Sequence, residues 1–260
     1  MALDGPRVLG SLSRTVNSHQ EVQTWAVRLD ASPAVIENCW RWLGPEERTR
    51  AERFHFDIHR TQFLVSHAVL RALLARATGR SPADLKFSHG ANGKPLLADD
   101  ASGLRFNMSH SGDLALYALT RGCEVGVDVE QIRPMLELEN VAARFFAAEE
   151  VAELQSLPES DRVEAFFRCW TRKEAYVKAV GDGLSMPLDR FRVTLKPGED
   201  ARLVRLGDDP EAASRWSMHH LSPAPNFVGA VMYLGEVRPL TEFPLVTGGD
   251  ILRPEFDQAD

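Results

Sequence analysis

Two acidic side chains lie in a short run that otherwise has the composition of a buried strand. Residues 125–130 read VGVDVE. Successive side chains of an extended chain point to opposite faces, so the three valines share one face and Gly126, Asp128 and Glu130 share the other. The valine face is typical of a core, whereas the other face carries two carboxylates roughly 7 Å apart. Two such carboxylates repel each other unless water, a basic group or a metal ion lies between them.

A third acid is expected on the inward side of a helix. In residues 161–180 the side chains of Phe166, Trp170, Glu174 and Lys178 fall on one helical face. An acid on a buried face is costly unless it is paired or bound to a metal. Two explanations are open at this point. Glu174 forms an ordinary pair with Lys178 one turn later, or it binds a cation together with other acids.

The strand acids and the helix acid together offer hard oxygen ligands for a metal ion. Mg²⁺ prefers an octahedral shell of carboxylate, water and phosphate oxygens. Zinc is disfavoured, because the chain has no His/Cys set at ligand spacing. The sequence therefore predicts that Asp128, Glu130 and Glu174 converge on one magnesium ion.

Four motifs in this order resemble the 4′-phosphopantetheinyl transferases of the long, two-lobed type. They are the G-K-P turn at Gly93–Pro95, the F-N-x-S-H-S strand end at Phe106–Ser111, the G-V-D-V-E strand at Gly126–Glu130, and the W-T-x-K-E helix from Trp170 with a lysine at Lys178. A G-x-G-L sequence follows at Gly181–Leu184. The resemblance runs from about Pro45 to Phe191 and leaves the first 20 residues and the C-terminal end uncovered.

The resemblance implies a reaction and its substrates. The family moves the phosphopantetheine arm of coenzyme A to a serine of an acyl or peptidyl carrier protein and releases 3′,5′-ADP. The two-lobed type activates the carrier proteins of polyketide and nonribosomal peptide synthetases. The fold implied is α+β, with two similar lobes in a pseudo-twofold arrangement, each with an antiparallel sheet packed on a long helix.

The resemblance also implies a role for particular residues. Glu174 would accept the proton of the carrier serine, and Lys178 would contact the phosphates and stabilise the leaving group. Asp128, Glu130 and Glu174 would bind Mg²⁺ with the coenzyme A pyrophosphate. The residues expected to contact coenzyme A are Arg50, Arg53, Gly93, Lys94, Pro95, Asn107, Ser109, His110, Asp128 and Lys178. Glu47 stands where some members have a basic residue, a departure that bears on how the 3′-phosphate is held.

The elements that must position these residues form two similar halves. The patterns predict a strand at 24–29, helices at 44–54 and 61–78, two strands within 104–120 joined through Ser111–Asp113, and the strand at 125–130. They then predict one helix at 140–157, another at 161–180, and strands at 202–206, 216–221 and 227–234. The expected organisation is a loose leader at 1–20, one lobe at 21–122, a second lobe at 123–240, and a mobile acidic tail at 241–260.

Composition narrows the classes of function. The chain of 260 residues has 30 Lys and Arg against 37 Asp and Glu, which argues against bulk binding to nucleic acid or to an anionic membrane. Three widely spaced cysteines without a C-x-x-C pair, and no recognisable signal peptide, indicate a cytoplasmic protein. Two similar halves in one chain favour a monomer.

Two rival functions follow from the same residues. One is a non-catalytic module that binds coenzyme A or a carrier protein. An acid on the inward face at Glu174 speaks against it, because binding alone does not require one. The other is a different Mg²⁺-dependent phosphoryl-transfer enzyme. It is disfavoured because the chain lacks a P-loop and the kinase signatures.

Overall fold

The computed structural model describes residues 21–90, 93–181, 186–209 and 211–252. The expected leader at residues 1–20 and the motif residues Gly183 and Leu184 lie outside this part of the chain.

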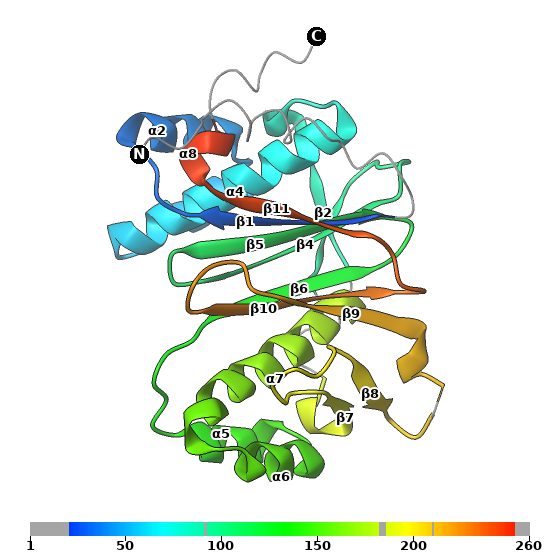
Figure 1. Cartoon of the computed structure of the whole chain (residues 1–260). Coiled ribbons are helices and arrows are strands. Elements are labelled where there is room, and N and C mark those ends of the chain that lie inside the picture. Colours follow the sequence, from blue (N-terminus) through cyan, green and yellow to red (C-terminus); the bar gives the residue numbers. More distant parts are fainter. Residues whose placement is uncertain (1–20, 91–92, 182–185, 210, 253–260) are drawn as a thin grey trace.

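Helices and sheets stack in four layers (Figure 1). The outer helix α4 (Asp57–Thr78) covers a sheet with the strand order β11-β1-β5-β4. A second sheet, β6-β10-β9, lies beneath the first, and helix α7 (Glu159–Val180) covers its other face. The strands are β1 (Val22–Arg28), β4 (Leu104–Ser111), β5 (Leu114–Arg121), β6 (Val125–Gln131), β9 (Trp216–Leu221), β10 (Phe227–Leu234) and β11 (Leu240–Thr247).

Three hydrophobic clusters fill the spaces between these layers. One lies between α4 and the first sheet and includes Leu64, Phe106 and Tyr117. The second joins the two sheets through Val127, Leu116 and related residues. The third lies between the second sheet and α7, with Phe166 at its centre. The sheets are thus buried on the faces that meet each other as well as on the faces that meet the long helices, which explains the nearly continuous apolar character of β5 and β10.

The same order of elements runs twice along the chain. The first half contains β1, α2 (Pro33–Trp42), α3 (Pro45–Glu52), α4, η1 (Pro82–Asp84), β2 (Phe87–His89), β3 (Pro95–Leu97), β4 and β5. The second contains β6, α5 (Leu138–Phe145), α6 (Ala148–Ser156), α7, η3 (Leu188–Arg190), β7 (Phe191–Val193), β8 (Leu203–Leu206), η4 (Ala213–Arg215), β9 and β10. Both α4 and α7 have 22 residues and end at a glycine in the left-handed conformation, Gly79 and Gly181. The predicted α+β class is confirmed.

The sequence prediction of one helix over 140–157 is wrong. The chain forms α5 and α6 instead, because Phe146 and Ala147 adopt extended backbone conformations between them. Phe146 is buried against Phe166 of α7, with ring centroids 5.1 Å apart. Glu150 then accepts a hydrogen bond from the Ala147 amide and caps the new helix. Burial of one aromatic ring and one cap therefore outweigh a continuous helical pattern.

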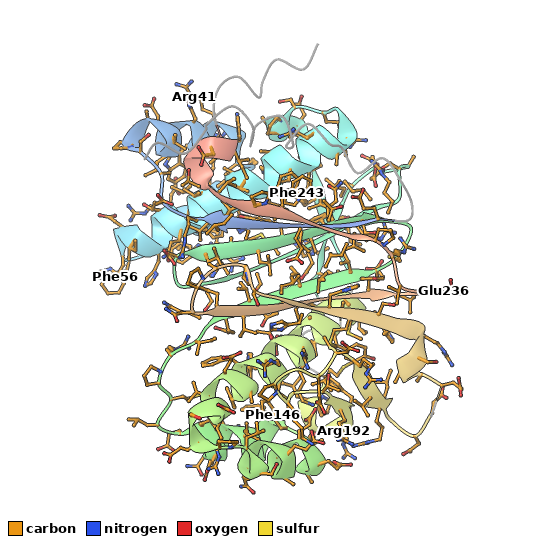
Figure 2. All side chains as sticks on the ribbon, viewed as in Figure 1. Arg41, Phe56, Phe146, Arg192, Glu236 and Phe243 are labelled. Carbon is orange, nitrogen blue, oxygen red and sulfur yellow. The ribbon has the colours of Figure 1, made fainter. Side chains whose placement is uncertain are left out.

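The prediction of a mobile tail from residue 241 is also wrong for the part that the structure describes. Residues 240–247 form β11, which pairs in parallel with β1 and so returns the chain to the first sheet. Phe243 stacks on Trp25 with ring centroids 3.5 Å apart, and Figure 2 labels it on the upper sheet. The short helix α8 (Gly248–Ile251) follows, while residues 253–260 lie outside the described part.

None of the helices in the described ranges combines the length and apolar character needed to cross a membrane.

Candidate active site

The acidic strand β6 lies between α7 and the first sheet. Val125, Val127 and Val129 belong to the cluster between the two sheets, as the alternation predicts. Gly126 lies on the opposite face, where a Cβ atom would be 2.1 Å from the Ala175 carbonyl oxygen of α7. Asp128 and Glu130 share that face with Gly126, and they are therefore directed towards α7. This part of the prediction is confirmed.

Strand β4 of the first half holds β6 through alternate side chains. The Asn107 side-chain oxygen accepts a hydrogen bond from the Val127 amide at 2.9 Å. The Ser109 hydroxyl donates to Asp128 Oδ1 at 2.7 Å, and the Ser111 hydroxyl donates to Glu130 Oε2 at 2.6 Å. The Gln131 amide in turn donates to Ser111 Oγ at 3.1 Å. These bonds tie the two halves together beside the acids, and Ser111 is a contact that the sequence analysis did not identify.

Asp128 is the most buried of the three acids, with a relative exposure of 4%. Its Oδ1 atom accepts hydrogen bonds from Ser109 and from Lys178 Nζ, the latter at 2.6 Å. Lys178 Nζ also donates to Ser109 Oγ at 2.9 Å. Lys178 therefore forms its ion pair with an acid of the strand, and not with Glu174 one turn earlier on its own helix. The second oxygen, Oδ2, is buried and has no hydrogen-bond partner among the described residues.

Glu174 and Glu130 carry raised pKa values. For Glu174 the main cause is burial, followed by the nearby Asp128 carboxylate and, more weakly, by Glu130, while Lys178 opposes the rise. For Glu130 burial again raises the pKa most, and Asp128 adds to it against the hydrogen bond from Ser111. The three carboxylates thus lie within electrostatic reach of one another, on β6 and the facing side of α7.

These acids suit a hard divalent cation, although they are not drawn together around one. Within the described ranges, no group of three or more His, Cys, Asp or Glu side chains has the geometry of a metal site. Like charges resist closer approach, and Lys178 already binds Asp128 Oδ1. The buried oxygen Asp128 Oδ2 and the oxygen-only donor set of Glu130 and Glu174 fit Mg²⁺ better than zinc.

Lys94 forms three hydrogen bonds within the protein. Its ammonium group donates to the Glu124 carboxylate and to the Val125 carbonyl at 2.9 Å each, and to the Ala179 carbonyl at 2.8 Å. All three of its hydrogens are used in these bonds. Lys94 therefore connects the turn after β2 to the start of β6 and the end of α7. The coenzyme A contact assigned to Lys94 stays a prediction.

A second group of basic side chains lies beside the acids. His110 is an exposed residue at the end of β4, and the pKa of its imidazole is lowered, first by partial desolvation and then by the neighbouring His67, Lys178 and Arg50. Arg50 of α3 lies over the Phe63 ring at 5.4 Å, and His67 of α4 contacts Glu47 at 3.0 Å. The sequence analysis expected Arg50, His110 and Lys178 to contact coenzyme A, and the structure brings them to one place. The sequence analysis did not identify His67 as a member of this group.

The remaining expected contacts come from a turn, the end of a helix and two strands. Gly93 has a φ of 86° and forms the turn before β3, whose first residue is Pro95. Arg53 caps the C-terminus of α3 and is exposed. The cofactor contacts assigned to Gly93, Pro95, Arg53 and Asn107 stay predictions.

Comparison with known proteins identifies the family. Residues 28–121 match the 4′-phosphopantetheinyl transferase N-terminal family, and residues 124–232 match the 4′-phosphopantetheinyl transferase superfamily. The 4′-phosphopantetheinyl transferase HetI of a Nostoc species is 39% identical over 217 residues, which cover 83% of this chain and 88% of the relative. The chain belongs to the 4′-phosphopantetheinyl transferase family. It is a transferase that moves the 4′-phosphopantetheine group to carrier proteins.

Two further relatives of the transferase are more distant. The 4′-phosphopantetheinyl transferase Sfp of Bacillus subtilis is 34% identical over 163 residues, or 61% of this chain and 69% of the relative. The human L-aminoadipate-semialdehyde dehydrogenase-phosphopantetheinyl transferase is 28% identical over 192 residues, or 68% of this chain and 62% of the relative. The two matched families meet between residues 121 and 124, where the chain passes from β5 of the first sheet to β6 of the second.

Proposed function

We propose that this transferase uses Mg²⁺, held by Asp128, Glu130 and Glu174, to move phosphopantetheine from coenzyme A to a serine of an acyl or peptidyl carrier protein. The observation that carries the proposal is the Asp128 carboxylate. One of its oxygens binds Lys178 and the other is buried without a hydrogen-bond partner in the described residues, facing a helix that carries Glu174. A buried carboxylate oxygen without a hydrogen-bond partner calls for an explanation, and a bound cation supplies one.

Each residue of the site has a chemical role in the proposed transfer. When bound, Mg²⁺ would neutralise the charge of the coenzyme A pyrophosphate. Glu174 would accept the proton of the carrier serine, and its raised pKa is favourable for a general base. The serine oxygen then forms a bond to the phosphorus of the phosphopantetheine arm, and the bond from that phosphorus to 3′,5′-ADP breaks. Lys178 would stabilise the negative charge that develops on the leaving phosphate.

The proposed partners are carrier proteins of polyketide and nonribosomal peptide synthetases, with the transferase acting as a cytoplasmic monomer. The resemblance of the four sequence motifs to the two-lobed type supports this choice. The buried polar contacts between β4 and β6 also support a monomer, because the second half packs on the first as a partner subunit would.

The proposal is tested with an apo carrier protein, coenzyme A and the full-length chain. The intact mass of the carrier is measured with Mg²⁺ present and again after chelation by EDTA. We expect the mass to increase by one phosphopantetheine group in the presence of Mg²⁺ and to stay unchanged in EDTA. An unchanged mass with both an acyl and a peptidyl carrier would instead support the rival function of a binding module, and transfer in EDTA would remove the metal from the proposal.

Binding of coenzyme A is expected to take up a proton at His110. The pKa of this imidazole is lowered in the free protein by partial desolvation and by the positive charges of its neighbours, so the neutral ring is favoured at pH 7. A bound phosphate favours the charged ring and raises its pKa. The affinity for coenzyme A should therefore increase as the pH falls through the pKa that His110 has in the complex. It should level off below the lower pKa that His110 has in the free protein.

Calorimetry in buffers of different ionisation enthalpy measures this proton uptake at pH 7. His110→Gln is expected to abolish it, whereas His89→Gln, at an exposed residue in β2, should leave it unchanged. Equal uptake by the wild type and His110→Gln would show that His110 does not contact the phosphates.

A further inference from the structure

A fully buried ion pair joins α6 to α7, and its lysine directly precedes Glu174. Lys173 and Glu150 both have side chains with 0% exposure, and Lys173 Nζ lies 2.7 Å from Glu150 Oε2. Lys173 also donates to the Leu188 and Phe191 carbonyl oxygens at 2.7 Å each, and its Nζ lies 4.4 Å from the centre of the Phe191 ring. A lysine side chain is usually exposed to solvent, whereas that of Lys173 is fully buried.

Glu150 connects this lysine to two further elements. Its Oε2 accepts a hydrogen bond from the Ala147 amide at the start of α6, and its Oε1 accepts one from the Val193 amide of β7, each at 2.7 Å. Figure 2 labels Phe146, which lies between α5 and α6 in the sequence, in the lower layer near α7. The Glu150–Lys173 pair thus joins α6, α7, η3 and β7, and it leaves the lysine without an unused hydrogen.

The first half contains the same arrangement. Glu47 accepts a hydrogen bond from the Gly44 amide at the start of α3, and its Oε2 lies 2.6 Å from Arg71 NH2 of α4. Arg71 donates to the Pro82 and Leu85 carbonyl oxygens, and it lies over the Phe87 ring at 4.9 Å. Arg71 and Lys173 stand at the same position relative to Gly79 and Gly181, the glycines that end α4 and α7. An equivalent buried ion pair therefore occurs in each half of the fold.

The halves differ at the next residue of the helix. Ala72 follows Arg71 in the first half, whereas Glu174 follows Lys173 in the second. Adjacent residues on a helix point in directions about 100° apart, so a lysine fixed on one side of α7 determines where the next side chain points. On the other side, the backbone of α7 at Ala175 rests on Gly126. The helix is held between these two contacts and cannot rotate or slide without breaking one of them.

We propose that Lys173, anchored by Glu150, is a positioning residue that fixes Glu174 opposite Asp128 and Glu130. This inference rests on the proposed role of Glu174. Lys173 itself is too deeply buried to touch a substrate. A displacement of α7 by about 1 Å would move the Glu174 carboxylate away from the reacting hydroxyl, and a shift of that size can lower a rate by about 100-fold.

The test compares kcat with the folding of several variants. Lys173→Met alone would leave the Glu150 carboxylate buried without its cation and could prevent folding. The variant Glu150→Leu/Lys173→Met replaces both charges with apolar groups and should melt cooperatively near the wild-type temperature. Its kcat for carrier modification should fall by about 10- to 100-fold, with the KM for coenzyme A changed less than about threefold. Lys173→Arg should retain kcat within about fivefold, because Arg71 occupies the equivalent position.

A neighbouring ion pair supplies the control. Glu153→Gln/Arg192→Gln removes the pair that Glu153 of α6 forms with Arg192 of β7 and changes no residue of α7, so its kcat at saturating coenzyme A should stay within about threefold of the wild type. A wild-type kcat in Glu150→Leu/Lys173→Met would overturn the inference, as would an equal loss of kcat in both double variants. Should the double variant not fold, Glu150→Gln, which keeps an acceptor for Lys173, provides the same comparison. A wild-type chain that modifies no carrier would instead refute the proposed function.

Discussion

Replacing Glu174 with glutamine is expected to lower kcat for carrier modification by about 1,000-fold, with the fold retained. Loss of a general base alone costs about 100- to 10,000-fold. Glutamine cannot accept the serine proton, and as a neutral group it is also a weaker ligand for a cation. The substitution preserves the size of the side chain, which is half-buried on α7.

Although Glu174→Gln lowers the rate, it should not lower the stability of the folded protein. Burial and the Asp128 carboxylate disfavour the charged form of Glu174 and raise its pKa, so its charge opposes folding above that pKa. The unfolded chain loses this group's proton at a lower pH than the folded chain does. Stability contributed by the protonated form is therefore present at low pH and decreases as the pH rises through the raised pKa. At neutral pH the glutamine variant should melt at the same temperature as the wild type or slightly higher.

Intact mass of the carrier as a function of time measures the rate, and circular dichroism measures the melting temperature. Glu159→Gln provides the control, because Glu159 is an exposed acid in the first turn of the same helix. Its rate should equal that of the wild type. If Glu174→Gln modifies the carrier at close to the wild-type rate, the proton acceptor must be another group.

The positions of the three acids could be predicted because local periodicity determines them. The alternation in residues 125–130 places Asp128 and Glu130 on one face of β6, and helical spacing places Glu174 on the inward side of α7. The partner of Lys178 could not be predicted in this way. Spacing within the helix favours Glu174, but the tertiary fold brings Asp128 of β6 to 2.6 Å, and a buried carboxylate is the stronger partner.

The partners of the two lysines and the position of β11 were not predictable, for one physical reason. A lysine in a sequence is expected in solvent, and only long-range partners make its burial possible. Lys173 meets Glu150 from another helix, and Lys94 meets Glu124 and two carbonyl groups from another half of the chain. Strand β11 was not predicted because only a few apolar residues, among them Phe243 and Val246, place it in the core, and their partner Trp25 comes from the start of the chain. Such contacts join residues that are far apart in the sequence, so the periodicity of a single helix or strand does not reveal them.

Gly126 is the residue at which we expect the largest loss of stability from one added methyl group. The glycine of the strand motif has no side chain to take part in chemistry, and the sequence analysis gave it no role beyond its place on the acidic face. In the structure a Cβ atom at this position would lie 2.1 Å from the Ala175 carbonyl oxygen, 2.3 Å from the Ala179 nitrogen and 2.8 Å from the Lys178 carbonyl carbon. All three are backbone atoms of α7, so no side-chain rotation relieves the overlap.

Gly126→Ala should therefore force α7 away from β6 and lower the free energy of unfolding by about 3 kcal/mol or more, at the upper end of the cost of overpacking. Because the same displacement separates Glu174 and Lys178 from Asp128, any folded fraction should also transfer phosphopantetheine slowly. Urea unfolding measures the first effect. Gly249→Ala is the control, since its Cβ would meet only Thr247 Oγ1 at an ordinary 3.6 Å. If Gly126→Ala unfolds at the same urea concentration as the control and keeps its rate, close backbone contact between α7 and β6 does not position the site.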